Sequence, residues 1–148
     1  MTSISLEQAS RIVDAGLAHS QKLKLNPLTI AVLDAGGHLI AFKRQDRSGI
    51  LRPEIAHGKA WGALGMGSGG RTLAARAQIA PAFYTALVGT SEGRVIPVPG
   101  GVLVRDASGE VIGAVGISGD LPDNDEACAI RGIEEVGFVA DPGEAKPH

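Results

Sequence analysis

One segment of the chain carries the residue types best suited to chemistry. In RPEIAHGKAWGALGMGSGGR (52–71), Glu54 precedes His57 by three positions and Trp61 follows it by four. On a helix this spacing places the three side chains on one face. A carboxylate beside an imidazole can fix its tautomer or raise its pKa, which suits acid–base work or ligation. The plainer alternative is a helix-face histidine bonded to a neighbour or to water, and both interpretations stay open.

The same segment is unusually rich in glycine, with Gly58, Gly62, Gly65 and Gly67. An interior helix glycine costs about 1 kcal/mol against alanine, so something close by should compensate. Two candidates are a helix or subunit packed against that side and a ligand lying on bare backbone, and we favour packing. Lys59 falls away from the Glu54–His57–Trp61 stripe and is expected to be solvated.

Two further features could hold an acidic group. Gly100 and Gly101 follow Pro99, and consecutive glycines leave backbone N–H groups open to a carboxylate or phosphate. A β-bulge at the start of the next strand is the favoured alternative, and it is compatible with binding. Among the arginines that could clamp an acid with two bonds, Arg52 is preferred because it leads directly into the segment with Glu54.

The segment GISGDLPDNDEACA (116–129) supplies the remaining polar candidate, Asp120, which is expected to line the end of the sheet. Asp123 or Asn124 is expected to cap the following helix. An acidic metal site is the less favoured alternative. Zinc is not expected, because the chain has no HExxH motif and Cys128 has no cysteine partner. No metal site is therefore predicted.

The elements that position these residues can be read from local patterns. Ser5 and Gln8 form a capping box at the start of SLEQASRIVDAGLAHSQKLKL (5–25), which predicts a helix. The turns Asp-Ala-Gly-Gly (34–37) and Asp-Ala-Ser-Gly (106–109) each lie between two strand-like runs. Asp side chains bond to backbone two residues on, and Gly accepts a positive φ. Each turn therefore predicts a β-hairpin, and a structural turn is preferred to a pair of ligand loops.

Helices are predicted between the hairpins, over 52–67, 70–78 and 81–89, and again over 123–137. The run 94–98 is predicted to add an edge strand, because prolines at 97 and 99 fit poorly in a central ladder. Residues 139–148 are predicted to form a flexible tail. The fold class is α+β, with residues 1–148 as one domain and an antiparallel sheet of about five strands flanked by helices.

Composition narrows the function classes. The chain has 148 residues and a net charge of −2 without a basic block, so nucleic acid is not expected as a partner. Its apolar runs fall short of the roughly 20 residues that span a bilayer, so no membrane association is expected. The single cysteine and the absence of a signal-peptide pattern predict a cytoplasmic protein.

Four motifs carry a resemblance over almost the whole chain. In order they are VLDAGGHLIAFKRQD (32–46), AHGKAWGAL (56–64), PVPGGVLVRDASGEVIGAVGISGD (97–120) and DNDEACA (123–129). Together they resemble the HbpS/GlcG-like haem-binding family (DUF336), which is also similar to the C-terminal domain of PduO-type adenosyltransferases. The resemblance implies a profilin-like fold and assembly into homo-oligomers. It also implies haem or iron handling in some members and a place in small-molecule catabolism for others.

Two main functions follow for the candidate residues. In the first, the protein binds a small ligand, with haem the best-named one: His57 would be the axial ligand and Trp61 would help to cover the porphyrin. In the second, it is a cofactor-independent enzyme of small organic acid or alcohol catabolism. His57 and Glu54 would then move protons, while Arg52 and the Gly100–Gly101 amides hold the acid. Haem binding is ranked first, and an accessory subunit whose glycine-rich faces mediate assembly is the third possibility.

Overall fold

The computed structural model describes residues 2–146 and contains one five-stranded antiparallel sheet. Its strands lie in the order β2-β1-β4-β3-β5. Their bounds are β1 (Thr29–Asp34), β2 (Leu39–Arg44), β3 (Gly101–Arg105), β4 (Val111–Ser118) and β5 (Val139–Asp141). The predicted α+β class and the number of strands are confirmed.

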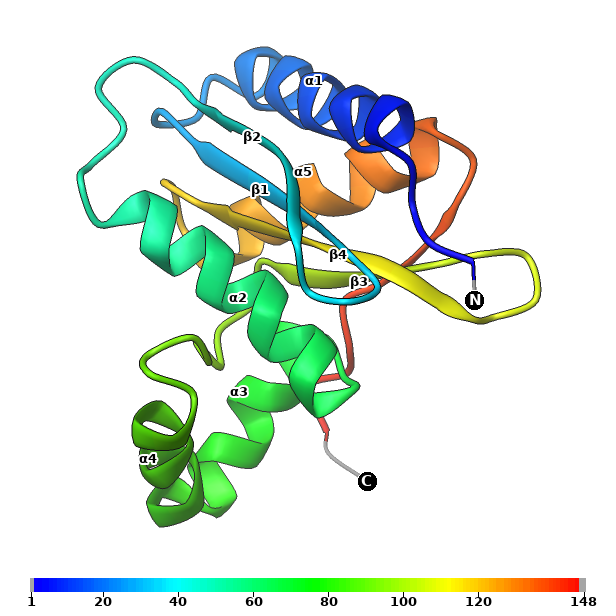
Figure 1. Cartoon of the computed structure of the whole chain (residues 1–148). Coiled ribbons are helices and arrows are strands. Elements are labelled where there is room, and N and C mark those ends of the chain that lie inside the picture. The colour runs from blue at the N-terminus through cyan, green and yellow to red at the C-terminus, as the bar shows by residue number, and fades with distance from the viewer. Residues whose placement is uncertain (1, 147–148) are drawn as a thin grey trace.

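Five helices complete the described chain: α1 (Leu6–Lys22), α2 (Arg52–Met66), α3 (Gly70–Ile79), α4 (Pro81–Thr90) and α5 (Pro122–Glu135). Helices α1 and α5 pack on each other over one face of the sheet, and α2 crosses the other face over β1, β4 and β3 (Figure 1). Helices α3 and α4 extend from the end of α2 away from the sheet (Figure 1). No described helix is long and apolar enough to cross a membrane.

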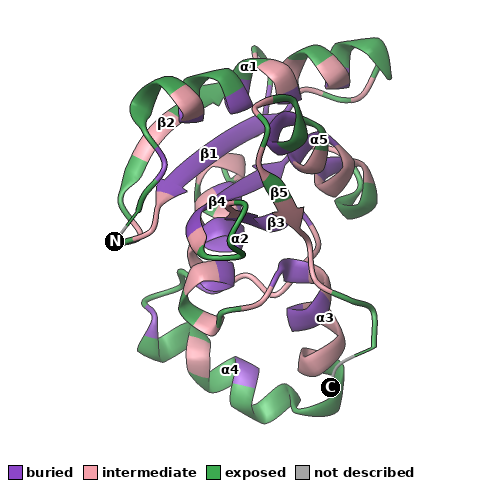
Figure 2. Ribbon diagram, turned by 90° about the vertical axis from the view of Figure 1, so that its right-hand side faces the viewer, coloured by how far each residue is buried: buried purple, intermediate pink, exposed green. Residues whose placement is uncertain are grey.

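The two faces of the sheet have different side chains. Large aliphatic residues, among them Ile30, Val32 and Ile117, are buried toward α1 and α5 in the main core. Figure 2 shows that β1 and β4 are buried along most of their length. Toward α2 the sheet combines two leucines, Leu33 and Leu103, with smaller residues. At one of these smaller positions, Gly116, a Cβ would collide with the carbonyl oxygen of Ala56. Glycine in the sheet therefore lets the backbone of α2 approach closely, which fits the use of glycine where backbones meet.

Two of the four glycines in and at the end of α2, Gly58 and Gly62, pack against another part of the chain, as predicted, whereas Gly67 ends α2 with a positive φ and has nothing within 4 Å of a Cβ built there. A Cβ at Gly58 would meet Ile96, and one at Gly62 would touch the Val95 backbone at 3.3 Å. The predicted edge strand at 94–98 is wrong, because this segment lies against α2 and Ile96 N donates to the Gly58 carbonyl at 3.2 Å. The fifth strand is β5, which pairs with β3 in the register Leu103↔Asp141.

Both Asp-Ala-x-Gly segments are hairpin turns, as predicted. Asp34 Oδ1 accepts hydrogen bonds from the backbone N–H groups of Gly36 and His38, each at 3.0 Å. Asp106 Oδ1 accepts in the same way at the second turn. The last residue of each turn, Gly37 and Gly109, has a positive φ, of 83° and 88°. One structural device is used twice.

Two predictions for the C-terminal third of the chain are wrong. Leu121, not Asp123 or Asn124, is the N-cap of α5 and makes no side-chain cap bond. The predicted tail from 139 begins with β5 and continues as a bonded segment, since Glu144 N donates to Thr72 Oγ1 at 2.7 Å. Residues 147 and 148 lie outside the described part of the chain. Pairing with β3 and α3, which are distant in sequence, orders this segment.

Candidate functional site

Helix α2 presents two opposite faces, as its period of 3.6 residues requires. Arg52 and Lys59 are two turns apart on the face toward β4. Glu54, His57 and Trp61 lie on the other side of the helix. Because α2 is continuous over Arg52–Met66, these three residues share one helix face, as predicted.

A groove of about 490 Å³ opens beside this second face. Its walls come from β1, β2, the first two turns of α2 and the connection after α4. The lining residues are Ala31, Leu39, Phe42, Pro53, Glu54, His57, Glu92, Gly93 and Arg94. Glu54 and His57 are thus brought together on one wall.

The apolar wall opposite His57 depends on a β-bulge. Leu33 pairs with Leu39 and Val32 pairs with Ala41, so Ile40 is the extra residue of β2. In a regular strand Leu39 and Phe42 would point to opposite faces, but the bulge places both on the groove side. Helix α2 does not cover this part of β2, and the two side chains remain 51% and 41% exposed. Exposed large apolar side chains grouped in a groove are typical of a binding site.

The half-buried His57 imidazole is held in its neutral form. Burial, followed by the positive charge of Arg94, lowers the pKa of His57 below its ordinary value of 6.5. Raising the pKa was one of two effects that Glu54 could have had on His57, and the shift is downward instead. Glu54 is exposed, and no hydrogen bond joins the two side chains among the described residues. A neutral imidazole is the form that ligates a metal or accepts a proton.

Arg94 is the functional candidate that sequence reasoning missed. Its guanidinium lies 4.4 Å from the centre of the Trp61 ring, and its Nε donates to the Ser91 carbonyl at 2.9 Å. Stacking on an aromatic ring and a backbone bond hold an exposed arginine in place. It is 37 positions from His57 in the sequence, and no local pattern relates the two.

Trp61 lies beside the groove without lining it. Its indole touches the first hairpin turn, where a Cβ at Gly37 would lie 3.4 Å from Trp61 Nε1. It also lines a smaller hollow of about 190 Å³ with that turn. Its connection to His57 runs through Arg94, which stacks on Trp61 and borders the groove.

The other candidate residues lie outside the groove. Arg52 Nη1 donates to Ser118 Oγ at 3.0 Å, and Asp120 accepts from Asn26 N at 3.0 Å and from Asn124 Nδ2. Hydrogen bonding from Asn124 lowers the pKa of Asp120. Gly100 and Gly101 are buried against α2. These four residues build the end of the sheet near Ser118.

Lys59 is the clearest disagreement with the sequence analysis. Predicted to be solvated, it is only 3% exposed, and its Nζ donates to Asp125 Oδ2 at 3.2 Å. Burial lowers the pKa of Lys59 and raises the pKa of Asp125, and the contact between the two side chains offsets both effects. The helical spacing correctly predicted that Lys59 points away from His57. That side of α2, however, faces the protein interior and not the solvent.

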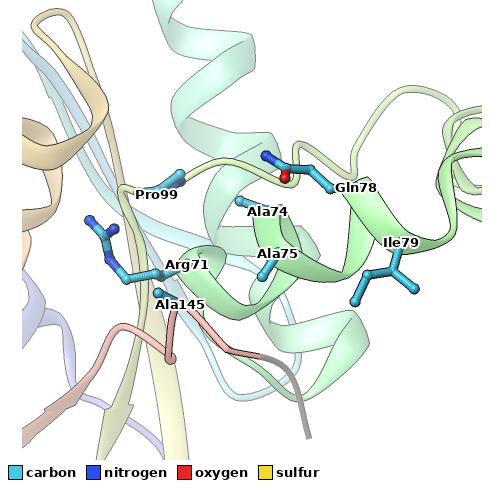
Figure 3. Close-up of a pocket in the computed structure, with 7 residues that line it drawn as sticks. All are labelled: Arg71, Ala74, Ala75, Gln78, Ile79, Pro99 and Ala145. Carbon is cyan, nitrogen blue, oxygen red and sulfur yellow. The ribbon is translucent and has the colours of Figure 1, made fainter.

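A second cavity, of about 530 Å³, lies along α3 beside Pro99 and Ala145 (Figure 3). Its charged side chain is Arg71, with Gln78 and alanines making up most of the rest. The Arg71 guanidinium is already engaged by Asp123 and Glu126. It is therefore a poorer anion site than the groove with Arg94. Among the described residues, no cluster of three or more His, Cys, Asp or Glu could hold a metal ion.

Residues 4–134 match the family described as haem degrading protein HbpS-like. The chain belongs to this HbpS-like family. It is 37% identical to the protein GlcG of Escherichia coli K12 over 125 residues, which cover 78% of this chain and 81% of GlcG. The family predicted from the four motifs is thereby confirmed.

Solved structures agree with this assignment. The crystal structure of a PduOC:Heme complex superimposes with a TM-score of 0.83 at 26% identity, covering 93% of this chain and 97% of that one. The crystal structure of HbpS gives a TM-score of 0.80, also at 26% identity, with 93% and 92% covered. The α+β fold of this HbpS-like chain is therefore shared with a relative that was crystallised with haem.

Proposed function

We propose that this HbpS-like protein binds haem in the groove between α2 and β2, with His57 as the iron ligand. The observation that carries the proposal is one imidazole held neutral by burial and Arg94 and facing the apolar side chains of Leu39 and Phe42. Support from relatives comes from the PduOC:Heme complex.

The groove residues fit the chemistry of a porphyrin. Haem iron is commonly held by a histidine imidazole, and Leu39 and Phe42 offer apolar surface to the ring. Arg94, at the rim, offers a guanidinium that can pair with a propionate. Bound haem would supply a redox-active iron, while the chain orients the ring and keeps His57 unprotonated. Trp61 would act by holding Arg94, and Arg52, Gly100, Gly101 and Asp120 by shaping the end of the sheet.

A second candidate is a cofactor-independent enzyme acting on a small organic acid. One observation favours it: the neutral imidazole of His57 and the guanidinium of Arg94 border the same groove. Arg94 would hold the carboxylate, and His57 would accept a proton from a C–H or O–H group of the bound substrate, whose bonding electrons stay on that carbon or oxygen. Exposed Glu54, on the same wall, would stabilise the imidazolium that results.

Haemin titration tests the first function against the second. Wild type and His19→Ala should both give a saturable one-to-one Soret spectrum, because His19 lies on α1 across the sheet from the groove. His57→Ala should lose that spectrum or bind at least about tenfold more weakly. Equal spectra in all three proteins would reject His57 as the ligand. No saturable binding in wild type would reject haem and leave small organic acids, screened by thermal shift, as the next ligands to test.

A further inference from the structure

The most deeply buried ion pair among the described residues joins the two layers that flank the sheet. Lys59 belongs to α2 and Asp125 to α5, on opposite faces of the sheet, and they are 3% and 1% exposed. Lys59 Nζ donates to Asp125 Oδ2 at 3.2 Å and to the Ile117 carbonyl at 2.8 Å. The lysine side chain therefore passes the end of β4 to reach the opposite layer.

Gly100 leaves the space for this side chain. A Cβ built at Gly100 would lie 2.8 Å from Lys59 Nζ, and the residue has a φ of 116°, which side chains rarely allow. A Cβ at Gly101 would collide with the Lys59 carbonyl oxygen. The Gly100–Gly101 pair that resembled an anion-binding loop thus has a structural explanation in the path of Lys59.

Helix α2 is held at a second point of the same strand. Arg52 Nη1 donates to Ser118 Oγ at 3.0 Å, next to the Ile117 carbonyl that Lys59 contacts. The anchoring residues are two turns apart on one helix face. Two anchors on one face restrict both the sliding of a helix and its rotation about its axis.

The buried side chains of α2 other than Lys59 specify its rotation weakly. The helix has no side-chain N-cap bond at Leu51, and its buried positions other than Lys59 are alanines and glycines. Small residues let backbones approach but interlock little, whereas buried polar pairs can fix one arrangement among several similar ones. Rotation matters here because His57 lies two residues before Lys59 and reaches the groove from the opposite face.

We infer that the Lys59–Asp125 pair is a positioning device that sets the rotation of α2 and so presents His57 and Glu54 to the groove. The inference rests on the proposed function for its consequence in ligand binding, but the placement of His57 can be tested without a ligand. Asp125 Oδ1 also accepts from Asp120 N at 3.0 Å, so the same carboxylate orders the start of α5.

The variant K59M/D125N tests whether the pair positions α2, separately from any effect of the pair on the stability of the protein. It removes both charges, leaves neither of them buried alone, and keeps an oxygen that can accept from Asp120 N. The matched control R131M/E135Q removes an ion pair that is 49% exposed on both sides. D125N alone, which retains Lys59, is measured in parallel in case the double variant does not fold. Urea unfolding identifies the variants that are folded.

Two readouts are then compared with wild type. The pKa of the His57 ring, followed by NMR, should rise toward its ordinary value in K59M/D125N, in part in D125N, and not in R131M/E135Q. Haemin affinity should fall by about tenfold or more in K59M/D125N, by less in D125N, and not in R131M/E135Q. A folded variant without the pair, in which His57 titrates and binds haemin as in wild type, would overturn the inference. If wild type fails to bind haemin, the proposed function fails, and the His57 titration still decides the role of the pair.

Discussion

At the scale of single residues, His57 makes the stability of the protein depend on pH. Its pKa is lowered in the folded state by burial and by Arg94, so between that value and 6.5 the unfolded chain binds more protons at this site. The free energy of unfolding should therefore fall as the pH drops below about 6.5. Urea unfolding between about pH 5 and pH 8 should show a shallower fall for His57→Gln than for wild type. Parallel curves for His57→Gln and wild type would contradict a lowered pKa of His57. His19→Gln, at a histidine on α1, is the control.

Arg94 should matter to both the ligand and His57. Replacing it by Gln removes the charge that helps to lower the pKa of His57, so that pKa should rise. A charge-assisted hydrogen bond contributes about 1.5–3 kcal/mol, so haemin affinity should fall by about tenfold or more. Arg94→Lys keeps the charge. The pKa of His57 should therefore stay close to its wild-type value in this variant, whereas the haemin affinity should be preserved less well. Unchanged haemin binding in Arg94→Gln would remove Arg94 from the proposed site.

At the scale of elements, the close contact between α2 and the sheet depends on glycine in β4. Alanine at Gly116 would place its Cβ against the Ala56 carbonyl, and such overpacking costs about 1–3 kcal/mol. A Cβ at Gly89, in α4, would have nothing within 4 Å of it, so alanine there should stabilise by about 0.5–1 kcal/mol. Urea unfolding of Gly116→Ala and Gly89→Ala should give changes of opposite sign. A neutral Gly116→Ala would show that α2 can move away from the sheet without cost.

The elements themselves were largely predictable because their signals are local. Ser5 and Gln8 form the predicted capping box at α1, and Asp34 and Asp106 close the predicted hairpin turns. The mistaken strand at 94–98 has a physical reason. After Arg94 its residues are apolar like those of a strand, but the segment bonds to α2 and not to the sheet. Competition between two buried surfaces for one apolar segment is not visible in a sequence.

At the scale of the whole molecule, α4 is an uncharged helix whose exposed apolar side chains suit contact with a partner. It has no charged residue and contacts chiefly α3, and Figure 2 shows most of it exposed. Phe83 is 53% exposed, Val88 47%, and Ile79, just before the helix, 73%. A helix that is apolar all round is normally buried. A second copy fits the expected homo-oligomer, because an uncharged helix can pack against itself across a two-fold axis.

This assembly can be tested by light scattering after size-exclusion chromatography. Wild type should have the mass of an oligomer, and Phe83→Glu with Val88→Glu should shift it toward the monomer, because the charges would be buried at the interface. Leu6→Glu, at a residue of α1 that is 65% exposed, is the matched control and should leave the mass unchanged. A monomeric wild type would contradict the prediction.

What the sequence determined by itself is the set of local structures and the stripe that they carry. Residue periodicity placed Glu54, His57 and Trp61 on one face of α2, and turn chemistry placed the two hairpins. Tertiary structure alone decided that Arg94 and Phe42, on its bulged strand, lie beside that stripe. It also decided that Lys59, on the opposite face of α2, pairs with Asp125 across the end of the sheet. The reason is that helix period and turn geometry act over a few residues, whereas burial and charge act between segments that only folding brings together.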